Sequence, residues 1–188
     1  AAGRTALLLQ ITKYGHVELL HYGGILPMED APAMAARRTM PYGSEVMYTE
    51  DDPVYCLDNI PLLWSGSGKG DFRIPPIELE LPDGTFTTDF IYESCTLRPG
   101  TLPAVGLPGA YDETGEAETL VLSLREKKYA LRLELVFTVF PGADVITRRT
   151  VLHNEENSAV TIRRLMSMQI DLPQREYEMI TLDGDWIS

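Results

Sequence analysis

Acidic side chains stand out among the residues of this sequence that could do chemistry. The 188-residue chain carries 28 Asp and Glu residues against 16 Lys and Arg residues. Sugar hydrolysis uses two carboxyl groups about 5–10 Å apart across the scissile bond, but abundance alone identifies no such pair. The densest acidic run, Glu50-Asp51-Asp52, offers oxygen ligands that suit Ca²⁺. It lacks the spacing of an EF-hand, so we expect a solvated loop and no metal site.

A glycine-rich segment, Gly66-Ser67-Gly68-Lys69-Gly70-Asp71, raises the question of phosphate binding. A Walker loop needs Gly-Lys followed by Ser or Thr at the start of a helix. Here Gly70 follows Lys69, and the pattern of a strand comes next. The dinucleotide-binding fingerprint fails for the same reason. We therefore expect a glycine-rich turn and no nucleotide cofactor.

Nucleophiles and transition-metal ligands are few. Cys56 and Cys95 have no neighbouring Cys, and we expect both to be buried, unreactive thiols. We expect His16, His21 and His153 to lie on strand faces, because no Gly-x-Ser-x-Gly elbow or other catalytic motif accompanies them. The residues by themselves therefore predict no catalytic residue, no metal and no cofactor.

Alternation of apolar and polar residues with a period of two dominates the chain. Odd positions between Tyr129 and Val139 are apolar, which predicts a strand that buries one face. Val136 and Phe140 fall on the other face and indicate that it is partly covered. Five further strands are expected, at residues 7–11, 17–22, 119–124, 145–152 and 166–172.

Two turns are predicted between strands. Residues 77–81 and 86–92 both alternate, and Pro82-Asp83-Gly84 between them has turn chemistry, so we expect a β-hairpin. Residues 154–158 are polar and predict a tight turn between antiparallel neighbours. No stretch of a dozen residues has a helical stripe, and 13 Pro and 15 Gly interrupt the chain. The fold class predicted is all-β, an antiparallel β-sandwich.

The organisation expected is a single domain over residues 1–188, with long loops at 27–53 and 98–118. The net charge of −12 argues against nucleic acid and anionic membranes as partners. No apolar stretch approaches the ~20 residues of a membrane-spanning helix, and no basic segment followed by an apolar one suggests a secretory signal. A cytoplasmic protein is expected.

Six sequence blocks occur in a fixed order between residues 57 and 186. They are LDNIPLLW (57–64) with GKGDFRIP (68–75), GLPGAY (106–111), AETL (117–120), DVITR (144–148), the stretch 154–173 and ITLDGDW (180–186). Their order and spacing resemble the N-terminal domain of family 36 glycoside hydrolases, the microbial α-galactosidases. Any one block would be a weak signal, but six in order are specific.

This resemblance implies a β-supersandwich of the galactose-mutarotase-like kind that precedes a catalytic (β/α)₈ barrel. The family places its Asp nucleophile and Asp acid/base on barrel loops, and neither motif occurs in this sequence. The resemblance therefore implies an incomplete domain, inactive alone, whose partner is the catalytic barrel of the same polypeptide. The parent enzyme would act on terminal α-galactosyl residues of oligosaccharides by a retaining mechanism, as a homo-oligomer.

Trp64 is the residue for which the resemblance suggests substrate binding. Leu63 and Trp64 stand where the family frequently has Glu and Tyr. An indole ring matches the apolar face of a sugar, and in tetrameric members an N-terminal loop reaches a neighbour's sugar pocket. We therefore expect Trp64, with loop 27–53, to be a candidate for that role. The alternative is that Trp64 anchors the core.

Three charged residues in the first block are assigned a structural or pocket-shaping role: Asp58, Asp71 and Arg73. Asp71 and Arg73 are two positions apart, so on a regular strand they share a face and can form an ion pair. No residue is assigned a catalytic role.

Two other functions remain open from the sequence. One is a stand-alone carbohydrate-binding module, with Trp64, Tyr42, Tyr48 and Tyr55 as stacking residues. The other is a mutarotase-like or phosphorylase-associated sandwich, since such folds recur beside other sugar enzymes. The three histidines offer no recognisable mutarotase motif.

Overall fold

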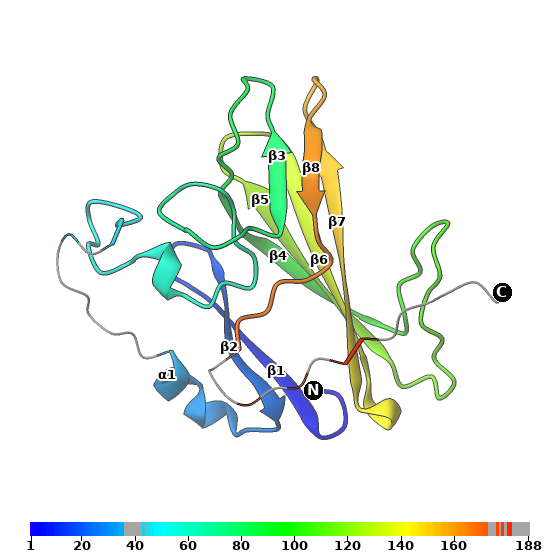
Figure 1. The fold of residues 1–188 in the computed structure, drawn as a ribbon. Coiled ribbons are helices and arrows are strands. Elements are labelled where there is room, and N and C mark those ends of the chain that lie inside the picture. Colours follow the sequence, from blue (N-terminus) through cyan, green and yellow to red (C-terminus); the bar gives the residue numbers. More distant parts are fainter. Residues whose placement is uncertain (36–42, 44, 173–175, 177, 179, 182–188) are drawn as a thin grey trace.

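The computed structural model describes residues 1–35, 43, 45–172, 176, 178, 180 and 181. Within them the chain forms strands joined by turns and a few short helices (Figure 1). The strands are β1 (Thr5–Ile11), β2 (Val17–Gly24), β3 (Ile77–Glu80), β4 (Phe90–Pro99), β5 (Glu118–Glu126), β6 (Leu131–Phe140), β7 (Val145–Asn154) and β8 (Thr161–Leu165). The helices are η1 (Met28–Asp30), α1 (Ala31–Met34), η2 (Leu57–Asn59) and η3 (Pro141–Ala143).

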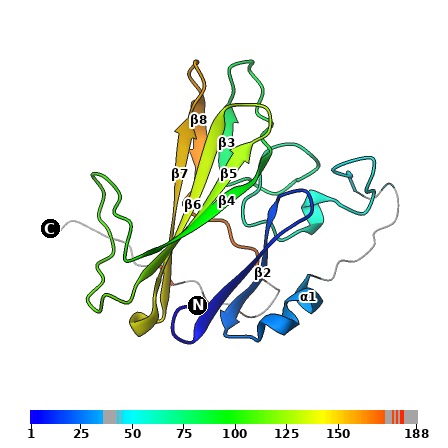
Figure 2. The same cartoon turned by 180° about the vertical axis from the view of Figure 1, so that it is seen from behind.

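The strands form three antiparallel sheets. The largest has the order β4-β5-β6-β7, so each strand pairs with its neighbour in sequence. β1 pairs with β2, and β3 pairs with β8. Both views show β3 and β8 against one face of the four-stranded sheet, with the β1-β2 pair beside them (Figures 1 and 2). The prediction of an all-β, antiparallel fold is confirmed.

One core joins the three sheets. Every second residue of β6 from Leu131 to Phe137 is buried, as the alternation predicted. These side chains belong to one cluster with Leu79 of β3 and Val17 of β2, so each sheet contributes to the same apolar interior. Burial of this interior is the main favourable term that holds the layers together.

The opposite face of β6 is also covered. Val136 is 2% exposed and Thr138 is 7% exposed, although both point away from the core cluster. Segments 101–104 and 108–111 of the connection between β4 and β5 line a pocket over these two residues. The expectation of a partly covered second face is therefore confirmed, and the long loop predicted near residues 98–118 supplies part of the cover.

The predicted hairpin over residues 77–92 is wrong in its pairing. The turn is present, because the Leu81 amide donates to the Thr85 carbonyl and Gly84 takes a positive φ of 80°. However, β3 pairs with β8 and not with residues 86–92. Thr88 and Asp89 are buried, and the Thr88 amide donates to Ser67. These bonds draw the chain away from β3 and into β4 of the other sheet.

Two expectations near the C-terminal end are also corrected. The strand predicted at residues 166–172 is not formed, because β8 ends at Leu165 and the following polar side chains bond to other segments. The turn at residues 154–158 joins β7 to β8, but these strands lie in different sheets. It is therefore a crossing between layers and not a hairpin turn.

Candidate functional site

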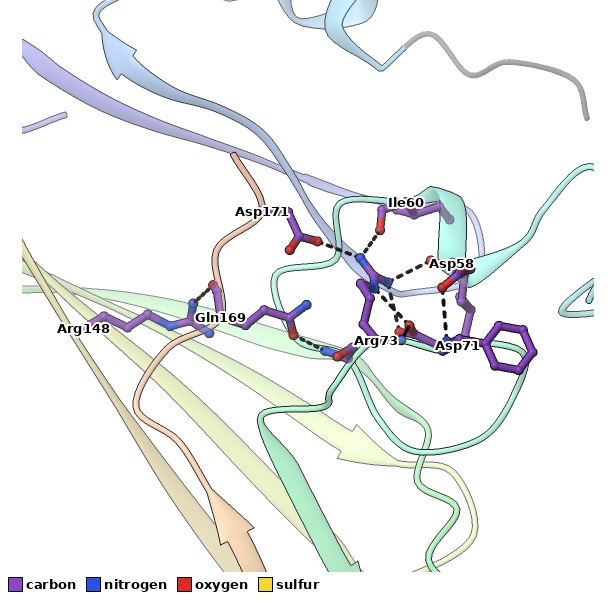
Figure 3. A network of polar contacts seen from close by, with 10 residues as sticks. Asp58, Ile60, Asp71, Arg73, Arg148, Gln169 and Asp171 are labelled. Carbon is purple, nitrogen blue, oxygen red and sulfur yellow. Dashed lines mark hydrogen bonds and ion pairs between the residues drawn. The ribbon is translucent and has the colours of Figure 1, made fainter. Parts of the chain in front are cut away.

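Arg73 lies at the centre of a polar network that joins three segments of the chain (Figure 3). Its Nε and Nη2 donate to the two carboxylate oxygens of Asp71, each at 2.9 Å. Nη1 donates to Asp171 Oδ2 and to the Ile60 carbonyl, both at 2.7 Å. Nη2 also donates to the Leu57 carbonyl at 2.9 Å. All five N–H groups of the planar guanidinium therefore donate hydrogen bonds, and these bonds hold the three segments together.

The Arg73–Asp71 pair is shielded from water. The Asp71 side chain is 1% exposed and that of Arg73 is 22% exposed. Burial by itself lowers the pKa of Arg73, but the hydrogen bonds and charges of Asp71 and Asp171 outweigh it and raise that pKa above its ordinary value. The ion pair expected from the two-residue spacing is thus present in the structure. Any part it has in shaping a sugar pocket stays a prediction.

Asp58 forms a hydrogen bond with the backbone of Phe72, the residue between Asp71 and Arg73. It lies in η2, and its Oδ1 accepts a hydrogen bond from the Phe72 amide at 3.1 Å. Asp71 and Arg73 turn inward, whereas Phe72 and Ile74 are 75% and 76% exposed. The sequence did not predict that Phe72 is exposed on a hydrogen-bonded stretch of backbone. The pattern that could have indicated it is the alternation of charged and apolar residues from 71 to 74.

Trp64 lies in the core and not on the open surface. It is 5% exposed and belongs to the main apolar cluster. The guanidinium of Arg148 lies 5.9 Å from the centre of its ring. This burial favours the alternative that Trp64 anchors the core. The substrate-binding role assigned to it stays an untested prediction, and part of loop 27–53, residues 36–42 and 44, lies outside the described residues.

The glycine-rich segment is a tightly packed turn. A Cβ added to Gly66 would lie 2.6 Å from the Thr88 carbonyl oxygen. One added to Gly70, whose φ is +78°, would lie 2.6 Å from the Cβ of Val46. Close approach of backbone and side chains therefore accounts for these glycines.

A second buried network surrounds Asp89. His16 Nε2 lies 3.0 Å from its Oδ1, and the Tyr48 hydroxyl donates to its Oδ2 at 2.8 Å. The Tyr55 hydroxyl lies 2.9 Å from His16 Nδ1. Burial raises the pKa of Asp89, but the hydrogen bonds from His16 and Tyr48 and the charge of Lys127 bring it below its ordinary value. No local sequence pattern predicts this cluster, because its members are far apart in the chain.

The stacking residues of a stand-alone binding module are mostly enclosed. Tyr55 is 3% exposed, and Tyr48 is half-buried with its hydroxyl bonded to Asp89. Tyr42 lies outside the described residues. The described aromatics near this cluster therefore pack against one another and not around an open groove.

The other candidate ligands are dispersed. Asp52 forms an ion pair with Lys13, and the described residues contain no group of three or more His, Cys, Asp or Glu side chains placed to hold a metal ion. Burial raises the pKa of the Cys56 thiol. Cys95 is exposed, so the expectation that both thiols are buried is wrong for Cys95. In the part of the chain described here, no helix has the length and apolar character needed to span a membrane.

Comparison with known proteins assigns the chain to a family. The model of the glycosyl hydrolase family 36 N-terminal domain matches residues 15–188. The chain is 37% identical over 130 residues to "Probable alpha-galactosidase G" of Emericella nidulans, covering 69% of this chain and 18% of that protein. It is 29% identical over 178 residues to alpha-galactosidase Mel36A of Lactobacillus acidophilus, covering 94% of this chain and 24% of that protein.

Solved structures agree. The α-galactosidase from Lactobacillus brevis superposes with a TM-score of 0.86 at 27% identity, over 92% of this chain and 23% of that one. A variant of the family 36 α-galactosidase AgaA from Geobacillus stearothermophilus, solved in complex with raffinose, gives a TM-score of 0.84 at 26% identity over 92% of this chain and 24% of that one. The chain thus spans about a quarter or less of the length of these relatives. It belongs to the N-terminal domain family of the family 36 glycoside hydrolases.

Proposed function

We propose that the polypeptide to which this domain belongs is a retaining α-galactosidase that removes terminal α-galactosyl residues from oligosaccharides. The support is the family match over residues 15–188 together with relatives that are α-galactosidases. One of the similar structures holds raffinose, an oligosaccharide of this type. The acid pair for this chemistry then lies in another domain, and this domain acts as a scaffold. Its location in the cytoplasm stays a prediction.

The observation that carries the scaffolding role is the surface that Arg73 holds in place. Five hydrogen bonds from its guanidinium fix the backbone on both sides of Phe72. Phe72 and Ile74 nevertheless point outward and are about three-quarters exposed. Neighbouring apolar side chains held rigidly in water mark a contact surface. We infer that this surface meets the catalytic domain or a second subunit, and that the enzyme is a homo-oligomer.

Phe72→Ser in the full-length polypeptide tests this role. We expect kcat/KM on a chromogenic α-galactoside to fall about threefold or more, or the assembly observed in sedimentation to become smaller. Stability of the domain is expected to change little, because Phe72 is exposed. Phe86→Ser is the matched control, since Phe86 is also exposed but lies beyond the turn that follows β3.

Three results would contradict the proposal. If Phe72→Ser and Phe86→Ser behave alike in both measurements, the contact surface is elsewhere. If the full-length polypeptide lacks α-galactosidase activity, the proposed activity fails. If residues 1–188 alone turn over the substrate, the assignment of chemistry to another domain fails. Titration of residues 1–188 with raffinose measures the rival function, because a carbohydrate-binding module would bind the sugar without the rest of the enzyme.

A further inference from the structure

Arg148 is a charged residue in an otherwise uncharged row. It lies in β7 directly opposite Phe137 of β6, and residues that pair across strands share a face of the sheet. On the same face of β7, Ile146 and Leu152 pack against the main core cluster, and Thr150 lies between Arg148 and Leu152. The Arg148 guanidinium lies 5.2 Å from the ring centre of Phe137. The side chain therefore points inward, among apolar and aromatic groups.

Arg148 has no carboxylate partner among the described residues. Nη1 donates to the Gln169 carbonyl at 2.8 Å (Figure 3). Nη2 donates to the Leu63 carbonyl at 3.0 Å. Nε is buried and makes no hydrogen bond within that part of the chain. A guanidinium has five N–H donors, so Nη1 and Nη2 each keep one N–H, and Nε its single N–H, without an acceptor among the described residues. Burial alone lowers the pKa of Arg148 to about 10, which leaves the group charged at neutral pH.

A pocket lies against this guanidinium. It has a volume of about 350 Å³ and is lined by Arg148 together with side chains from both hairpin strands β1 and β2, from β6 and β7, and from the segment after β8. Its apolar lining includes Leu7, Leu19, Leu63, Phe137, Ile146 and Leu172. The volume falls within the range of small-molecule sites, and few convergent polar groups in an apolar wall are typical of them.

The chemistry of this pocket selects one kind of occupant. An unpaired, partly desolvated guanidinium is best satisfied by a carboxylate, which accepts two parallel hydrogen bonds. The apolar walls favour a hydrocarbon body behind that carboxylate. Since the whole chain carries a net charge of −12, long-range attraction does not recruit anions, and binding depends on these local contacts.

We propose that this pocket binds a small organic monocarboxylate with an apolar body, whose carboxylate is held by Arg148. The inference does not depend on the proposed enzymatic function. An Asp or Glu side chain from elsewhere in the full-length polypeptide is the other source of a carboxylate. The occupant is a free small molecule, and the titrations that follow separate the two sources.

Calorimetric titration of the full-length polypeptide with octanoate is the test. For a ligand of this size we expect a dissociation constant of about 0.1–1 mM. Octanamide, which has the same shape without the charge, is expected to bind at least tenfold more weakly, and acetate to give no signal. Arg148→Met is expected to lower octanoate affinity at least tenfold. Arg149→Met is the matched control, because Arg149 donates to the Pro103 carbonyl beside the other face of the sheet.

A second pair of variants keeps the test decisive if Arg148→Met does not fold. Leu172 lines the same pocket and is 39% exposed, so Leu172→Glu places an internal carboxylate there, whereas Leu172→Gln places a neutral group of the same shape. We expect Leu172→Glu to abolish octanoate binding and Leu172→Gln to retain it. Equal affinities for octanoate and octanamide, or equal effects of the two Leu172 variants, would overturn the proposal. Binding to residues 1–188 but not to the full-length polypeptide would overturn it too, because the longer chain then fills the site.

Discussion

A single guanidinium at Arg73 holds together the segment around η2, the turn at residue 71 and the segment after β8. A lysine in its place keeps the charge, but its single ammonium has only three N–H donors and cannot reach five acceptors that lie in different directions. We expect Arg73→Lys to lower the free energy of unfolding by about 2–4 kcal/mol, because buried acceptors and a buried carboxylate lose their donors. Equilibrium urea unfolding of residues 1–188 measures this change.

The control for this prediction is Arg163→Lys. Among the described residues Arg163 pairs only with Glu80, and its side chain is 56% exposed. Exposed single pairs contribute little, so this substitution is expected to change stability by less than about 0.5 kcal/mol. If the two substitutions change stability equally, Arg73 does not hold these three segments together.

Sequence spacing could predict only the local part of this site. Asp71 and Arg73 are neighbours in the chain, and their pairing follows from a two-residue period. Asp171 is 98 residues from Arg73, and no local pattern announces such a contact. For Trp64 the sequence left both a sugar-binding and a core position open, since an aromatic next to a turn can face either the core or the solvent.

At the scale of elements, alternation identified most strands but not all of their partners. A period of two tells which face of a strand is apolar, and any other strand with an apolar face can then pair with it. The turn after β3 has the chemistry of a hairpin, yet β3 pairs with β8. What decides the pairing is the set of polar bonds made by Thr88 and Asp89, which the local sequence does not specify.

Asp89 connects several elements by hydrogen bonds and makes the stability of the fold depend on pH. It stands just before β4, accepts a hydrogen bond from Tyr48 of loop 27–53 and contacts His16, the residue just before β2. Its pKa in the folded protein lies below the ordinary value of 3.8. The stabilisation it provides is therefore complete well above pH 3.8, and it is lost as the pH falls through 3.8 toward the lower folded-state pKa.

Asp89→Asn is expected to remove this dependence. The variant should be less stable than the parent chain at pH 7, and the difference should shrink as the pH falls from about 5 to about 2. Urea midpoints across that range measure the two curves. Parallel curves for the parent chain and the variant would show that Asp89 does not have the lowered pKa assigned to it.

At the scale of the whole molecule, three sheets share one core, but the layer formed by β3 and β8 has only two short strands. β3 and β8 are short, and β8 pairs with β3 alone among the described residues. Ile162, Leu165 and Met166, along β8 and just after it, are 37–53% exposed. Relatives that match this domain are about four times longer, so their remaining residues are available to cover such a surface.

Residues 1–188 on their own are therefore expected to associate through this edge. An open strand edge with apolar side chains is a template for pairing, and contiguous apolar surface binds hydrophobic dyes. We expect dye fluorescence and oligomers in sedimentation at micromolar concentrations, despite the repulsion between chains of charge −12. Ile162→Lys places a charge on the exposed edge and is expected to reduce both signals at least twofold.

Val105→Lys separates the effect of position from that of net charge. Val105 is fully exposed on the loop between β4 and β5, so this variant changes the net charge as Ile162→Lys does but leaves the β8 edge apolar. If association depends on that edge, Val105→Lys keeps the dye signal and the oligomers. If the parent chain is monodisperse and binds no dye, or if the two lysine substitutions have equal effects, association does not depend on the edge of β8. The β3-β8 layer would then be stable in water without further residues to cover it.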